Sequence, residues 1–77
     1  MNPEAWLSNR LQSHGVDIYA GGPFASLRER IAYVIVTNRY GAVVCGRHDG
    51  KPETYAEVFE RIYGASLPKP SQLKCST

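Results

Sequence analysis

The chain has 77 residues, of which 43% are hydrophobic and 21% charged, and its formal net charge is +2. A chain of this length forms one domain that buries only about 60% of its unfolded surface, so it has little stability to spare for a strained active site. The composition excludes a wholly disordered chain, and no run approaches the ~18 apolar residues of a membrane span. A net charge of +2 is too small to indicate nucleic-acid binding by itself.

The N-terminal segment predicts a helix from about Pro3 to His14. Asn2 is a favourable N-cap, and proline suits the first helical position. Gly15 is expected to end this helix in the left-handed conformation. The first residues lack the basic start and apolar core of a signal peptide, so we expect a cytoplasmic protein. The apolar anchors of the helix are Trp6, Leu7 and Leu11.

The next segment contains one strand candidate and one ambiguous stretch. Val16–Ala20 is a short strand candidate, and Gly21–Pro23 must be a turn or loop, not a phosphate loop. Phe24–Arg30 admits two interpretations. Ser26–Glu29 fits a capping box that would open a helix, whereas the β-branched residues of Ile31–Thr37 favour one long strand. We favour the strand.

Two runs rich in β-branched residues then flank a short polar turn, Asn38–Gly41. This pattern predicts a hairpin of Ile31–Thr37 and Ala42–Gly46. Cys45 would pack in the second strand as a small hydrophobic residue, and Cys75 lies in the tail. We expect both thiols to be free, because nothing else indicates an oxidising compartment.

The clearest helix signals follow at Thr54. Thr54–Glu57 fits a capping box, and Gly64 fits the C-terminal cap. Glu57 and Arg61 have the spacing and order of a stabilising i,i+4 pair. We expect residues 65–77 to form an extended tail. The apolar face of the helix consists of Tyr55, Val58, Phe59, Ile62 and Tyr63.

The predicted fold class is therefore α+β, in the order α-β-β-β-α. A three-stranded antiparallel sheet would carry two helices on one face, within a single domain of residues 1–64. Both faces of the central strand are apolar, although the open face of such a sheet should be polar. We expect that face to be covered by the tail through Leu67 and Leu73, by a second copy of the chain in a homodimer, or by a partner. The alternative is a central strand that tolerates a few exposed apolar residues.

This order resembles the double-stranded RNA-binding domain. Gly22-Pro23 falls where that family has a Gly-Pro turn between its first two strands, Ile31–Thr37 and Ala42–Gly46 match its second and third strands, and Gly46–Lys51 matches its connection into the second helix. The resemblance covers most of residues 3–64 and implies the family's fold.

The departures from that family concern its usual ligand. The family opens its second helix with a lysine-rich motif that binds phosphates, whereas here only Lys51 remains, and Phe24 replaces the histidine after the Gly-Pro turn. Carboxylates at this position oppose phosphate binding. The resemblance thus implies a protein-binding role, like that of degenerate family members. The carboxylates are Glu53, Glu57 and Glu60.

The chain shows no arrangement typical of catalysis or metal binding. Its soft metal ligands are scattered without a C-x-x-C or H-x-x-H pair, so we expect no metal and no cofactor. His48 beside Asp49 could be an oriented base, but a solvated loop is the simpler interpretation since no nucleophile is nearby. We expect no enzyme. The soft ligands are His14, Cys45, His48 and Cys75.

Basic and aromatic residues between positions 28 and 51 are the candidate binding residues. They could be a solvated sheet edge, a protein contact, or a nucleic-acid face. We expect a non-enzymatic protein-binding module, in the class of small phage or mobile-element inhibitors that act on a larger host protein or nucleoprotein complex. The alternative is a nucleic-acid-binding domain, and we expect no membrane contact. The candidates are Arg28, Arg30, Tyr33, Arg39, Tyr40, Arg47, His48 and Lys51.

Overall fold

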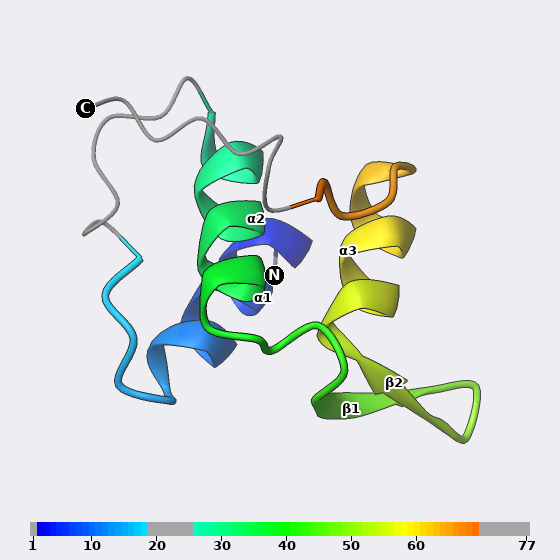
Figure 1. The fold of residues 1–77 in the computed structure, drawn as a ribbon. Helices are drawn as coiled ribbons and strands as arrows, with labels where there is room; N and C mark the ends of the chain where they lie inside the picture. Colours follow the sequence, from blue (N-terminus) through cyan, green and yellow to red (C-terminus); the bar gives the residue numbers. More distant parts are fainter. Residues whose placement is uncertain (1, 19–25, 70–77) are drawn as a thin grey trace.

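A computed structural model describes residues 2–18 and 26–69 (Figure 1). In these residues three helices pack around one core, and a hairpin lies at one end, leading directly into the last helix. The α+β class is confirmed, but the three-stranded α-β-β-β-α order is wrong, because the sheet in the described part of the chain has two strands. In chain order the elements are α1 (Pro3–Gln12), α2 (Leu27–Thr37), β1 (Val44–His48), β2 (Lys51–Thr54) and α3 (Tyr55–Tyr63).

The largest correction concerns Ile31–Thr37, which is the body of helix α2 and not a strand. Ser26 caps this helix, since its hydroxyl accepts the backbone N–H of Glu29 at 3.2 Å. The buried residues recur at i, i+1, i+3 and i+4, which is one face of a helix. The sheet face that needed a cover therefore does not exist, and the expectation of a homodimer through it loses its basis. The buried residues are Ile31, Ala32, Val34 and Ile35.

Helix α1 follows its capping signals. The Asn2 side chain accepts the backbone N–H of Glu4 at 2.8 Å, and Gly15 takes a left-handed φ of 80°. The helix ends at Gln12, two residues before the predicted His14, and a turn completes the segment. Residues 16–18 of the predicted strand Val16–Ala20 form no strand; its last two residues and the predicted Gly21–Pro23 turn lie outside the described residues.

The hairpin is real but lies later in the chain than predicted. Strands β1 and β2 are antiparallel, and Asp49-Gly50 form the turn with φ of 53° and 77°. Two positive φ values are typical of the type I′ turn that Asp-Gly favours. The predicted turn Asn38–Gly41 instead ends α2, and Gly46–Lys51 is part of the hairpin, not a connection to a helix.

Helix α3 is confirmed, including its capping box. The Thr54 hydroxyl accepts the N–H of Glu57 at 3.3 Å, and the Glu57 carboxylate accepts the N–H of Thr54 at 3.1 Å. Gly64 ends the helix with a left-handed φ of 67°. The predicted Glu57–Arg61 pair is wrong, because Glu57 serves the cap and Arg61 pairs with Glu53.

Replacement of Thr54 by alanine should lower the free energy of unfolding by about 1 kcal/mol, because the first turn of α3 loses the acceptor of its capping box. Ser66→Ala is the matched control, since it removes an exposed hydroxyl that donates only to the Glu60 side chain. Urea unfolding of both variants provides the comparison. Equal losses would show that the capping box does not stabilise α3.

The core draws on every helix and on β1. Tyr55 is fully buried, and Cys45 is buried with a free thiol whose pKa is raised by desolvation. Leu67, from the predicted tail, packs against this core. In the ranges 2–18 and 26–69, no helix has the length and apolar character to cross a bilayer. The buried core residues are Leu7, Leu11, Ile18, Ile31, Ala32, Val34, Ile35, Cys45, Tyr55, Val58 and Phe59.

Candidate functional site

A groove of about 360 Å³ lies between the start of α1, the hairpin and α3. Its wall on α1 is largely apolar, and the hairpin and α3 contribute charged side chains. We call this hollow the Trp6–Arg61 groove. Its lining residues are Pro3, Trp6, Gly46, Arg47, Glu53, Arg61 and Ile62.

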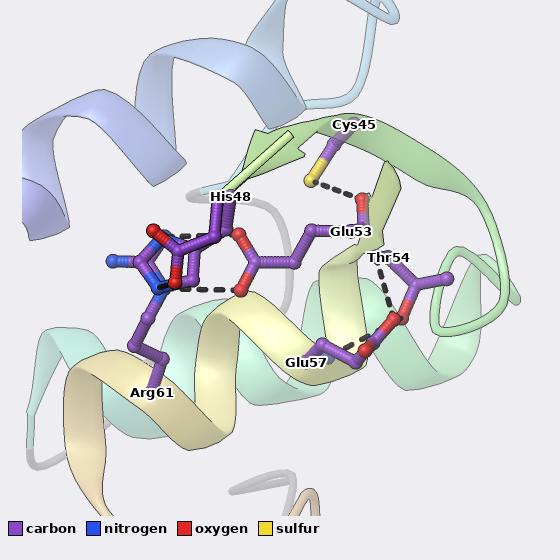
Figure 2. Close-up of polar contacts among 7 residues, drawn as sticks. Cys45, His48, Glu53, Thr54, Glu57 and Arg61 are labelled. Carbon is purple, nitrogen blue, oxygen red and sulfur yellow. Dashed lines mark hydrogen bonds and ion pairs between the residues drawn. The ribbon is translucent and has the colours of Figure 1, made fainter. Parts of the chain in front are cut away.

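A bidentate ion pair fixes the polar side of the groove. Arg61 Nε donates to Glu53 Oε2 and Arg61 Nη2 donates to Glu53 Oε1, each at 3.0 Å (Figure 2). Glu53 is only 7% exposed, whereas the Arg61 side chain is 44% exposed. The hydrogen bond from Arg61 lowers the pKa of Glu53 and outweighs the desolvation that would raise it. The carboxylate therefore stays ionised at neutral pH.

The strand–helix junction explains why these two side chains meet. Glu53 is followed directly by Thr54, which is both the last residue of β2 and the N-cap of α3. Arg61 lies in the last turn of the same helix, so its long side chain can reach back to Glu53. The backbone carbonyl of Glu53 accepts the Cys45 thiol at 3.6 Å, which ties β2 to β1 (Figure 2).

The indole of Trp6 forms the opposite wall. The Arg10 guanidinium lies 5.8 Å from the centroid of the indole, and its Nη2 donates to the carbonyl of Cys45 at 2.7 Å. A Cβ atom at Gly46 would lie 3.8 Å from the indole, so β1 passes close to the ring. Trp6 is half-buried and is held against the strand by these contacts.

The eight residues suggested by sequence do not form one surface. Arg47 lines the groove, and His48 and Lys51 are paired across the same end of the hairpin. Arg47 Nη1 donates to the carbonyl of Gly50 at 3.1 Å, and His48 lies 3.5 Å from Asp49. The remaining residues lie on or just after α2: Arg28, Arg30, Tyr33, Arg39 and Tyr40.

Arg30 and Tyr40, on the α2 side, have contacts that support the fold. Arg30 Nη1 donates to the carbonyl of Ile18 at 3.3 Å, which joins α2 to the segment after α1. The Tyr40 ring stacks on His14, with their centroids 4.8 Å apart. The predicted basic region is thus divided between the hairpin and the α2 side of the molecule.

Sequence reasoning missed three central residues of the groove. From sequence, Trp6 is an apolar anchor of the first helix, Glu53 is a carboxylate opposed to phosphate, and Arg61 is the expected partner of Glu57. The Glu53–Arg61 pair joins different elements, so its signal appears only when the hairpin and the helix cap are placed correctly.

A second hollow, of about 490 Å³, contains a histidine–tyrosine cluster. His14 Nε2 is hydrogen-bonded to the hydroxyl of Tyr55 at 2.7 Å, and desolvation raises the pKa of that buried tyrosine. The pair joins the turn after α1 to the first residue of α3 and supports their packing. Within residues 2–18 and 26–69, no three His, Cys, Asp or Glu side chains are grouped to hold a metal ion.

Comparisons with protein-family models, with curated proteins and with solved structures found no match to this chain. They neither support nor contradict the resemblance to the double-stranded RNA-binding domain. That resemblance places a strand at Ile31–Thr37, where the structure has helix α2.

Proposed function

We propose that the chain is a non-enzymatic protein-binding module whose contact surface is the Trp6–Arg61 groove. The main support is that the buried carboxylate of Glu53 holds Arg61 in place beside the half-buried Trp6. Tryptophan and arginine are the residue types that most often dominate binding energy at protein interfaces. Because both side chains are already held in place, less conformational entropy is lost when a partner binds.

The nucleophile chemistry of the described residues favours binding over catalysis. Burial raises the pKa of the Cys45 thiol, and a thiol that is not ionised is a poor nucleophile. His14 is hydrogen-bonded to Tyr55, a buried phenol that desolvation keeps protonated. Neither arrangement supplies an activated nucleophile with a base beside it.

The distribution of charge favours a protein over a nucleic acid. Phosphate binding depends on several cations along one surface, and here the basic side chains are divided between two regions. The groove itself contains the carboxylate of Glu53. Because small single-domain proteins are common among phage and mobile-element inhibitors, we further propose that the chain is such an inhibitor. It would act in the cytoplasm on a larger host protein or nucleoprotein complex.

Selection of a random seven-residue peptide library on the immobilised protein tests this proposal. Peptides should be enriched, and their binding should fall by about 10-fold or more with Arg47→Glu, which reverses a charge in the groove. Arg39→Glu is the matched control, because it makes the same charge change on an exposed turn residue outside the groove. Binding should survive this control.

Fluorescence anisotropy with labelled double-stranded RNA and DNA is the counter-experiment. We expect no binding at either ~50 mM or ~200 mM salt. Binding that weakens by orders of magnitude between the two salt concentrations would replace the protein-binding proposal with nucleic-acid binding. Failure to enrich any peptide would also contradict the proposed function.

A further inference from the structure

The open donors of Arg61 point to a specific kind of occupant for the groove. Resting on the proposed function, we infer that the groove binds an acidic side chain from an extended segment of a partner protein. The carboxylate would accept two hydrogen bonds from Arg61, and an apolar side chain beside it would pack against Trp6.

The first argument is the hydrogen-bonding capacity of Arg61. A guanidinium has five N–H donors, and Glu53 uses one on Nε and one on Nη2. In the described part of the chain, Arg61 donates only to Glu53, which leaves the two hydrogens on Nη1 and the second hydrogen on Nη2 for another acceptor. These atoms form the outer edge of the fork, whose geometry matches a carboxylate.

The second argument is the charge of the groove. Its charged lining residues are Arg47, Glu53 and Arg61, which gives two positive charges and one negative charge. Because Glu53 already pairs with Arg61, Arg47 is the remaining cation of the lining, and Asp49, outside the lining, is the other carboxylate that acts on Arg61. A single carboxylate from the occupant would neutralise the charge of Arg47.

The third argument is the apolar wall that borders these cations. Trp6 and Ile62 are half-buried, and Pro3 is exposed beside them. A volume of about 360 Å³ is at the small end of the range for ligand pockets, so it suits one or two side chains. An acidic residue next to an apolar residue matches both halves of the lining.

The composition of the selected peptides and their amide analogues provides the test. Peptides enriched from the random seven-residue library should carry aspartate or glutamate next to an apolar residue. Replacement of that acid by asparagine or glutamine should weaken binding by about 10-fold or more, measured by anisotropy of the labelled peptide. Enriched peptides without an acid, or amide analogues of equal affinity, would overturn this inference and leave the protein-binding proposal intact.

A conservative variant tests the role of the arginine fork. Arg61→Lys keeps a cation beside Glu53 but removes the planar outer edge, so we expect acidic peptides to bind about 10-fold more weakly. Arg39→Lys, the same substitution outside the groove, should bind like the unmodified chain. Urea unfolding checks that both variants are folded, and a folded Arg61→Lys variant with unchanged affinity would contradict the proposed contact.

Discussion

Replacement of Arg61 by alanine is expected to lower the free energy of unfolding by about 2–3 kcal/mol at pH 7, because it leaves the buried carboxylate of Glu53 without its charged partner. The converse change, Glu53→Gln, should have a smaller effect of about 1–2 kcal/mol. The asymmetry follows from exposure, since the Arg61 side chain is 44% exposed and can be hydrated, whereas Glu53 is 7% exposed.

The Glu53–Arg61 ion pair also makes stability depend on pH. Acid should destabilise the unmodified chain through this pair, whereas it should relieve part of the destabilisation of Arg61→Ala. In the unmodified chain, Arg61 holds the pKa of Glu53 below its ordinary value. The contribution of the ion pair to the free energy of unfolding is fully present at pH values above the ordinary pKa of a glutamate. It is lost as the pH falls through the lowered pKa of Glu53. In Arg61→Ala, desolvation outweighs the smaller lowering effect of His48 and raises the pKa of Glu53, so protonation in mild acid removes the buried charge and relieves the destabilisation.

Urea unfolding of both chains at pH 7 and at about pH 4 measures this difference. The gap in unfolding free energy between the unmodified chain and Arg61→Ala should narrow at the lower pH. A gap that stays constant with pH, or a larger loss for Glu53→Gln than for Arg61→Ala, would show that the buried carboxylate is not what Arg61 stabilises.

Replacement of Ile35 by alanine should lower the free energy of unfolding by about 3 kcal/mol. Ile35 is fully buried in the core, and the substitution creates a cavity there. The neighbouring change Val36→Ala should have a net effect below about 1 kcal/mol, because Val36 is only half-buried and alanine is the better helix former. The two variants thus differ strongly although both shorten an apolar residue.

This comparison also tests the helical assignment of α2. In a strand, Ile35 and Val36 would lie on opposite faces, and alanine would be unfavourable at both positions. Urea unfolding, with far-ultraviolet circular dichroism to follow helix content, gives both free energies. Similar large losses for the two variants would contradict helix α2. Because a domain of this size is only marginally stable, Ile35→Ala should also be partly unfolded near physiological temperature.

The fold was predictable from sequence where the signals were local. Asn2 with Pro3 and Thr54 with Glu57 define the starts of α1 and α3 through contacts between near neighbours. The Asp49-Gly50 turn has a similarly local signal in its Asp-Gly pair, but the predicted hairpin follows the β-branched flanks of Asn38–Gly41. Turn chemistry was the better indicator there, since Asp-Gly readily adopts two successive positive φ values.

Helix α2 shows why a β-branched run is ambiguous. The residues Ile31 to Val36 have high strand propensity, but burial against other helices decides their conformation. Their second apolar face was the informative sign. A half-exposed strand alternates between apolar and polar residues, whereas a helix facing the core can place apolar residues at i, i+1, i+3 and i+4.

The candidate site was less predictable than the fold, because it depends on tertiary placement. Arg47 was found from the local excess of basic residues. Glu53 and Arg61 meet only because β2 runs into α3 without a linker, and Trp6 joins them only because α1 packs on β1. No spacing within a single element encodes these contacts.

The two sides of the groove are joined to the rest of the molecule in different ways: one side is continuous along the chain, and the other is held by packing and side-chain contacts. Since Thr54 belongs to both β2 and the cap of α3, the hairpin and α3 form a single unit without a hinge between them. The side of the groove that carries Trp6 belongs to α1. Two hydrogen bonds connect α1 to that unit: Arg10 donates to the carbonyl of Cys45, and the Tyr63 hydroxyl donates to Glu4 at 2.8 Å. A wider groove would therefore require α1 to move against the core in which Leu7 and Leu11 are fully buried.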